Sequence, residues 1–225
     1  MTPQIPLDLS PEPEYSFENF LISDTNRVAF ERLQNWPDVG FPILLLMGSA
    51  GVGKTHLGEA WLRKGENRLK SEITGDVKPA RLFDHNIWLD DVQDARENTL
   101  FTLINMALNG EIRSLLLSAN QPRESWNIEL PDLRSRVSNL PVVEINPPDD
   151  AILEPFLRKL FDDRGREINA ETIRYILTYC DRSADGLRKL ALDLHETAAS
   201  QKKDLTRTFV SRYCLLYTSP SPRDA

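Results

Sequence analysis

One stretch of nine residues constrains the fold of this chain more than any other. Residues Gly48–His56 have the sequence Gly-Ser-Ala-Gly-Val-Gly-Lys-Thr-His and fit the phosphate-binding pattern G-x-x-x-x-G-K-[ST]. An apolar run over 41–47 precedes it, and Leu57, Ala60 and Trp61 share one helical face behind it. A strand, a glycine loop and a helix N-terminus together direct backbone N–H groups and a helix dipole at an anion. The sequence therefore predicts a nucleotide-binding site.

Each part of this loop has an expected task. Lys54 is expected to reach the β- and γ-phosphates, and Thr55 to bind Mg²⁺. The alternative is a glycine-rich turn with a chance lysine, which the matching strand and helix on either side argue against. The predicted nucleotide-binding set is Gly48, Ser49, Ala50, Gly51, Val52, Gly53, Lys54, Thr55 and His56.

Composition narrows the class of protein. The chain has 225 residues, of which 40% are hydrophobic and 27% charged, as in ordinary globular proteins. A net charge of −7 argues against broad, non-specific binding of nucleic acid through its phosphates. Two cysteines, Cys180 and Cys214, make neither a metal cluster nor a disulfide framework and are expected to be reduced thiols. With no secretory signal and no apolar run long enough to span a membrane, we expect a cytoplasmic protein.

A second acidic motif follows the next clear strand. Residues 86–89 form an apolar run that ends in Asp90 and Asp91, the Walker B arrangement downstream of a phosphate loop. Asp90 would hold Mg²⁺, and Asp91 would orient or activate the attacking water. The alternative is that these acids simply follow a strand into a loop. The pairing with the phosphate loop favours the magnesium site.

Further along, two polar segments are candidate parts of the same site. A helix over 99–107 and a buried strand over 114–118 lead to Asn120, which either contacts the γ-phosphate or forms a turn. The segment 130–137 contains Arg134 and Arg136, which point the same way if the backbone is extended. A solvated basic turn is the alternative. A strand over 142–145 is expected to complete the sheet.

The remaining elements outline an α/β domain followed by helices. A helix capped by Ser23 or Asp24 is expected before the phosphate loop, whereas residues 64–79 have no clear pattern. After residue 147 the pattern becomes wholly helical, with helix caps at three polar residues. These caps are Asp149, Asn169 and Ser183. The fold class predicted is α/β: a parallel sheet with flanking helices, then a small all-helical lid, with nucleotide between the two.

With these motifs in this order, the chain resembles the AAA+ ATPases. Residues 16–20 and 25–27 resemble the entry to the ATPase domain of the bacterial replication initiator DnaA, and 89–93 resemble its Walker B segment. The resemblance implies that Asn120 is sensor 1 and that Arg136 is an arginine finger, so that the implied catalytic residues are Asp91, Asn120 and Arg136. Two departures stand out. The spacing between the two Walker motifs is shorter than in DnaA. Asp185 occupies the approximate position of the sensor 2 arginine, with Arg182 and Arg188 about one turn to either side.

The N-terminal segment narrows the resemblance. Residues 4–9, Gln-Ile-Pro-Leu-Asp-Leu, resemble the Q-x-x-L-x-L clamp-binding peptide of Hda-type regulators, with Gln4, Leu7 and Leu9 as anchors. Otherwise its apolar residues would lie on the chain's own core. We also expect no DNA-binding domain after the lid. The resemblance therefore implies a DnaA relative that docks on the DNA-loaded sliding clamp, the β subunit of DNA polymerase III, and promotes hydrolysis of DnaA-bound ATP.

Cofactors, oligomeric state and competing functions follow from the same resemblance. ATP or ADP with Mg²⁺ would be bound, turnover by the chain itself would be weak, DNA would be met through the clamp, and a homo-oligomer is possible. One alternative is an ATP-driven remodeller of the helicase-loader or transposition-helper type. Another is a passive module with a vestigial nucleotide site, against which Lys54, Thr55, Asp90 and Asp91 all argue.

The expected domain organisation has four parts. The last begins at Cys214 and resembles a read-through tail from sequencing adaptors, so we expect the natural chain to differ after Tyr213. The parts are a flexible clamp-binding segment over 1–14, the AAA+ nucleotide-binding domain over 15–146, the helical lid over 147–213 and the suspected non-native tail over 214–225.

Overall fold

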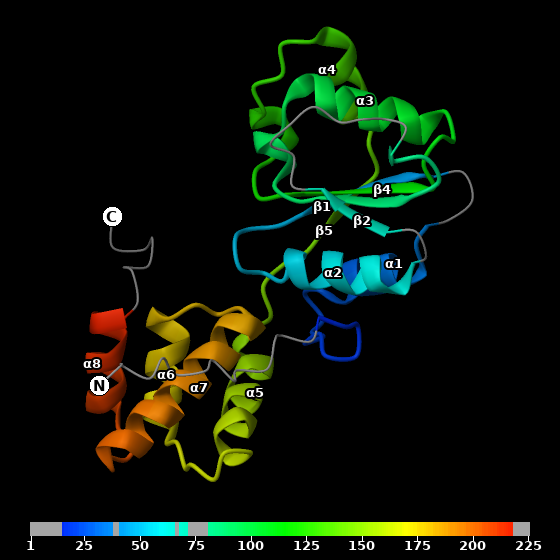
Figure 1. Cartoon of the computed structure of the whole chain (residues 1–225). Coiled ribbons are helices and arrows are strands. Elements are labelled where there is room, and N and C mark those ends of the chain that lie inside the picture. Colours follow the sequence, from blue (N-terminus) through cyan, green and yellow to red (C-terminus); the bar gives the residue numbers. More distant parts are fainter. Residues whose placement is uncertain (1–14, 38–40, 66–67, 72–80, 218–225) are drawn as a thin grey trace, which may run out of the picture.

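A computed structural model describes residues 15–37, 41–65, 68–71 and 81–217 of the chain. Within this part a five-stranded parallel sheet has the order β2-β3-β4-β1-β5 (Figure 1). The four predicted strands are confirmed, and β2 lies in the stretch that had no clear pattern. The strands are β1 (Ile43–Met47), β2 (Arg68–Ser71), β3 (Asn86–Leu89), β4 (Ser114–Ala119) and β5 (Val142–Glu144).

Helices cover both faces of the sheet, as the α/β prediction required. In Figure 1, α1 (Arg27–Asn35) and α2 (Lys54–Lys64) lie on one face, and α3 (Glu97–Leu108) and α4 (Pro131–Ser138) on the other. Side chains of β1 alternate between two cores, because successive residues of a strand point to opposite faces. Ile43 and Leu45 join the core with α3 and α4, whereas Leu44 and Leu46 join the core with α1 and α2.

A close approach of α2 to the sheet depends on one glycine. Trp88 of β3 is fully buried, and its indole N–H donates to Ser118 Oγ of β4 at 3.0 Å. A β-carbon placed on Gly58 of α2 would lie 2.4 Å from Trp88 Cε2, well inside van der Waals contact. Gly58 therefore allows the helix that follows the phosphate loop to pack directly on the strand that precedes Asp90.

The C-terminal part is a separate layer of four helices with its own apolar core (Figure 1). All three predicted caps are confirmed: the side chains of Asp149, Asn169 and Ser183 each accept a backbone N–H in the first turn of the helix that follows. α8 runs past Tyr213 to Tyr217, and Cys214 is buried in the lid core. The helices are α5 (Asp150–Asp162), α6 (Ala170–Tyr179), α7 (Ala184–Gln201) and α8 (Arg207–Tyr217).

The predicted cap of α1 is wrong. Asn26 occupies the N-cap position, and its side chain does not cap the helix but accepts the Ser23 N–H at 2.8 Å and donates to Leu21 O at 2.9 Å. These bonds fold the preceding turn, so neither Ser23 nor Asp24 caps the helix. Among the residues described, no helix combines the length and apolarity that crossing a membrane requires. Gln4, Leu7 and Leu9, the predicted clamp anchors, lie outside the described residues.

Candidate functional site

The phosphate loop joins the carboxyl end of β1 to the first turn of α2. Gly51 and Gly53 have φ values of +76° and +105°, in the left-handed region that favours glycine. A β-carbon on Gly48 would lie 2.5 Å from the carbonyl oxygen of Ile145, so a larger residue would push the loop from the sheet. Three glycines of the motif are thus required by geometry, and the resulting loop leads directly into a helix N-terminus.

Lys54 lies inside this loop. Its ammonium group donates to the carbonyl oxygens of Gly48 at 2.8 Å and Ser49 at 2.9 Å, and the residue is buried. Burial lowers the pKa of Lys54, and the nearby carboxylates of Asp91 and Asp90 act in the opposite direction. A cation is therefore held at the centre of the loop, in an environment that favours the arrival of further negative charge.

A chain of hydrogen bonds joins the two Walker motifs and continues into the core. Thr55 Oγ1 donates to Asp90 Oδ2 at 3.2 Å, and Ser118 Oγ donates to Asp90 Oδ1 at 2.6 Å. Since Trp88 in turn donates to Ser118, the Asp90 carboxylate is oriented from the buried side. Ser118 was not predicted, because a serine inside an apolar strand carries no sequence signal of its own.

The oxygen atoms of Thr55 and Asp90 suit a hard cation such as Mg²⁺. Nowhere in the described ranges do three or more His, Cys, Asp or Glu residues gather as a metal site. A Mg²⁺ ion here would thus need oxygen ligands from another source, and nucleotide phosphates and water are its usual ones.

Asp91 and Asn120 meet at the same edge of the sheet. Asn120 Nδ2 donates to Asp91 Oδ1 at 3.4 Å, and Asp91 has a positive φ of 47° at the turn after β3. Gln93, which was not predicted, donates to Asp91 Oδ1 at 3.3 Å and accepts the Asn120 backbone N–H at 3.3 Å. The structure thus gathers Lys54, Thr55, Asp90, Asp91 and Asn120 at the carboxyl ends of β1, β3 and β4.

Two residues of the predicted nucleotide-binding set have side chains that point elsewhere. Val52 is buried in the core formed with α1 and α2. His56 is also buried: its Nε2 lies 2.8 Å from Ser16 O, and its ring packs edge-on against Tyr15 and Phe20. The His56 side chain therefore fastens the N-terminal segment to α2.

The lid approaches the phosphate loop with the side chain of Asp181. A β-carbon on Gly51 would lie 3.2 Å from Asp181 Oδ1, at the turn between α6 and α7. Of the two arginines near the sensor 2 position, Arg182 pairs with Asp150, and Arg188 donates to Asn19 O at 2.7 Å. Arg182 and Arg188 thus bind partners other than the residues of the phosphate loop.

Arg136 lies far from these residues, and the expected extended segment around it is wrong. Arg134 and Arg136 belong to helix α4, so they point to different sides: Arg134 donates to Ile128 O, whereas the guanidinium of Arg136 lies 5.4 Å from the ring centre of Phe101. The sequence held the signal for this helix, with Pro131 at its first position and apolar residues four apart within it.

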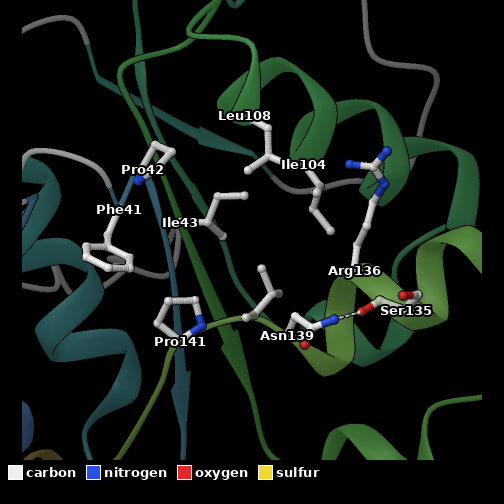
Figure 2. A pocket seen from close by; sticks show the side chains of 10 residues that line it. Phe41, Pro42, Ile43, Ile104, Leu108, Ser135, Arg136, Asn139 and Pro141 are labelled. Atoms are coloured by element: carbon white, nitrogen blue, oxygen red, sulfur yellow. Dashed lines mark hydrogen bonds between the residues drawn. The ribbon is translucent and has the colours of Figure 1, made fainter.

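Arg136 lines a groove at the opposite end of β1 from the phosphate loop. Figure 2 shows Arg136 on one side of this groove and Phe41 and Pro42, which precede β1, on the other. The five residues of β1 separate the groove from the loop, and a strand of that length covers about 16 Å. Arg136 is thus not placed to reach a phosphate bound in its own chain's loop.

Sequence comparison matches this chain to one family model and to individual proteins. Residues 11–73 match the family model of the bacterial DnaA ATPase domain. An uncharacterised protein of Haemophilus influenzae is 27% identical over 94% of this chain and 98% of its own length. The initiator DnaA of Nautilia profundicola is 27% identical over 75% of this chain and 44% of its own length. The chain spans about half the length of the curated DnaA relatives it matches.

Solved structures match the fold. Domain III of the Thermotoga maritima initiator DnaA has a TM-score of 0.69 at 18% identity, over 92% of this chain and 98% of that chain. AMPPCP-bound DnaA from Aquifex aeolicus has a TM-score of 0.66 at 21% identity, over 89% of this chain and 68% of that chain. At these identities the structures confirm the predicted AAA+ fold alone. Together with the sequence matches, they support a relationship between this chain and the bacterial DnaA branch of the AAA+ ATPases.

Proposed function

We propose that this chain is a nucleotide-binding AAA+ regulator of chromosomal replication initiation. It binds ATP or ADP with Mg²⁺, docks on the DNA-loaded sliding clamp and promotes hydrolysis of the ATP bound to DnaA. Its place of action is the bacterial cytoplasm at the nucleoid, and hydrolysis takes place mainly in the partner's site.

The chain's own site is suited to hold nucleotide. Lys54 would exchange its bonds to loop carbonyls for bonds to the β- and γ-phosphates, which satisfy a buried ammonium better because they carry charge. Thr55 and Asp90 would hold Mg²⁺, which supplies charge neutralisation at the phosphates when bound. Asp91, oriented by Asn120 and Gln93, would hold a water near the terminal phosphate.

The separation of Arg136 from this site is the observation that carries the proposal. Within the described part of the chain the Arg136 guanidinium makes no ion pair, and its recorded contact is the ring of Phe101. A guanidinium that stabilises charge on a transferring phosphoryl group must lie against that group. Since the chain's own phosphate loop is at the other end of β1, the phosphate served by Arg136 belongs to a second protein.

A single-turnover assay tests this role. DnaA is preloaded with labelled ATP, and its hydrolysis is followed with clamp, DNA and this chain. We expect Arg136→Ala to lower the stimulated rate by ~10³–10⁵-fold, the range for an arginine finger, and Arg136→Lys to restore little because lysine lacks the planar fork. Arg134→Ala, two residues away on the same helix, is the matched control. An undiminished rate with Arg136→Ala would rule out the finger role.

Clamp docking is tested separately, through residues outside the described part of the chain. Gln4→Ala combined with Leu7→Ala is expected to eliminate capture by the sliding clamp and to leave nucleotide binding intact. The parent affinity should be about micromolar, as suits a few side-chain anchors. If the double variant is captured as well as the parent, these residues do not form the clamp-binding peptide.

The main alternative, an ATP-driven remodeller, is separated by turnover. Rapid hydrolysis by the chain alone, unaffected by DnaA and the clamp, would favour it, because such a motor uses its own phosphate site.

A further inference from the structure

Helix α4, which carries Arg136, is held at its start by a carboxylate from another helix. The two oxygens of Glu97 accept the backbone N–H groups of Glu129 at 2.6 Å and Leu130 at 3.0 Å. Glu97 is the first residue of α3, so one carboxylate joins the beginnings of two helices. These N–H groups lower the pKa of Glu97, which keeps the carboxylate charged at neutral pH.

The other end of α4 is held by a cation. Arg123 Nη1 donates to Leu140 O at 3.2 Å and to Val137 O at 3.5 Å, where the helix ends. Carbonyl groups at the end of a helix carry partial negative charge, so a guanidinium is a suitable donor there. Glu97 and Arg123 therefore match the helix dipole in sign at the two ends of α4.

These two side chains matter because α4 is short. It spans Pro131–Ser138, and an isolated helix of fewer than ~12–15 residues is marginal in water. Its N-cap residue, Leu130, has no side-chain acceptor, and Leu133 and Val137 attach the helix to the core through apolar contact. Apolar contact is not directional. The charged groups at its ends are therefore what fix the place of α4 on the sheet.

Both residues come from segments that leave the candidate nucleotide site. Glu97 follows the turn after Asp91, and Arg123 follows closely after Asn120. Each segment contains a short 3-10 helix, which ends before Glu97 in one case and begins at Arg123 in the other. Since Asn120 donates to Asp91 at 3.4 Å, the two segments start from one contact. The position of α4 is thus tied to the carboxyl edge of the sheet.

Arg136 depends on where α4 lies. It belongs to the last turn of this helix, and its guanidinium lies 5.4 Å from the ring centre of Phe101 on α3. A ring face attracts a cation but does not fix it in one direction as a hydrogen bond does. The helix therefore decides where the guanidinium points. A displacement of only ~1 Å at a reacting group can cost ~100-fold in rate.

We propose that Glu97 and Arg123 are positioning residues for Arg136. Through the two ends of α4, they set where the guanidinium is presented and so how well it meets the phosphate of the partner. The inference rests on the proposed function and deepens it, because it identifies what holds Arg136 in place. Loss of either side chain should lower the rate of stimulated hydrolysis and leave partner binding near that of the parent.

The test separates rate from binding. Glu97→Ala and Arg123→Ala are made in the full chain, with Glu97→Gln and Arg123→Lys as conservative variants. Asp149→Ala is the matched control, because the Asp149 carboxylate accepts the Ile152 N–H at 3.1 Å and so caps a helix of the lid instead. Single-turnover hydrolysis of ATP preloaded on DnaA is titrated with each variant, in the presence of clamp and DNA. Thermal melting and the chain's own nucleotide affinity check folding.

The maximal rate should fall ~10–100-fold with either alanine variant, at a half-saturating concentration close to that of the parent. Glu97→Gln and Arg123→Lys should recover part of the rate, because glutamine keeps one oxygen acceptor and lysine keeps a cationic donor. Asp149→Ala should keep the parent's maximal rate although it lowers the melting temperature.

Maximal rates equal to the parent's in both alanine variants would overturn the inference and leave the proposed function standing. An equal loss with Asp149→Ala would also overturn it, since the effect would then be one of general stability. A change confined to the half-saturating concentration would assign Glu97 and Arg123 to partner binding and overturn it too. A parent chain that stimulates no hydrolysis would refute the proposed function and with it this inference.

Discussion

The two ends of the parallel sheet differ in chemistry although the same strands build both. At the carboxyl end, the polar side chains already have hydrogen-bond partners: Lys54 donates to loop carbonyls, Thr55 to Asp90, and Asn120 to Asp91. At the amino end, apolar side chains are exposed around a cation that has no ion-pair partner among the described residues. The first end is organised before any ligand arrives. The second is complete only when another surface covers it, which is why we assign a ligand to one and a partner to the other.

The largest expected effect is a loss of nucleotide binding at the carboxyl end of the sheet, with the amino end unchanged. Lys54→Ala removes the charge at the centre of the loop, and with it two or more charge-assisted bonds to phosphate, each worth ~1.5–3 kcal/mol. Calorimetry should show nucleotide affinity lowered more than ~100-fold. Melting temperature should change little, and Lys159→Ala, an exposed lysine of the lid, serves as control. Equal affinities in variant and parent would contradict the assignment of the phosphate loop.

A smaller effect is expected when serines at the two ends of one strand, β4, are compared. Ser118 of β4 donates to Asp90 Oδ1 at the carboxyl end, and Ser114 of the same strand donates to Asn86 Oδ1 at 2.5 Å at the amino end. Either substitution to alanine leaves a buried polar group without its partner and should cost ~1–3 kcal/mol of unfolding free energy. Only Ser118→Ala should also weaken the Mg²⁺ dependence of nucleotide binding, as measured by titration at fixed nucleotide. A matching loss with Ser114→Ala would mean that the effect is general destabilisation.

The smallest expected effect is the uptake of a proton when nucleotide binds. Burial lowers the pKa of Lys54 in the free protein, and bound phosphates raise it because they favour the charged ammonium. Between the two pKa values, nucleotide binding therefore takes up a proton, and affinity falls as pH rises through the lowered pKa. Calorimetry of ADP binding above pH ~8, where the phosphates no longer titrate, in buffers of different ionisation enthalpy should detect this uptake. Binding with no proton uptake as pH rises would show that Lys54 does not meet the phosphates.

The carboxyl end of the sheet was easier to predict from the sequence than the amino end. The phosphate loop and the acids after β3 are contiguous motifs whose residue types follow from their chemistry, so Lys54, Thr55 and Asp90 were found directly. Ser118 and Gln93 were missed because their roles depend on which strand and turn lie beside Asp90 and Asp91, and no local pattern contains that information.

The groove illustrates the same limit more strongly. Phe41 belongs to an apolar run that predicts a buried strand, yet it lies before β1 begins at Ile43, and its side chain is more than half exposed. Leu108, which also lines the groove, ends a helix whose other apolar residues are mostly buried. Their grouping exists only in three dimensions. In contrast, the helix around Arg136 was predictable, and the extended assignment failed because its proline and i, i+4 apolar spacing were not weighed.

The contact between Gly58 and Trp88 has a consequence for how such chains can evolve. Because no β-carbon fits at position 58 while an indole occupies position 88, neither residue can be replaced freely on its own. A larger residue at 58 should occur in relatives only together with a smaller one at 88, and Gly58→Ala should be tolerated better in a Trp88→Leu background than in the parent. We therefore expect positions 58 and 88 to covary. This covariation couples α2, which follows the phosphate loop, to β3, which ends just before Asp90.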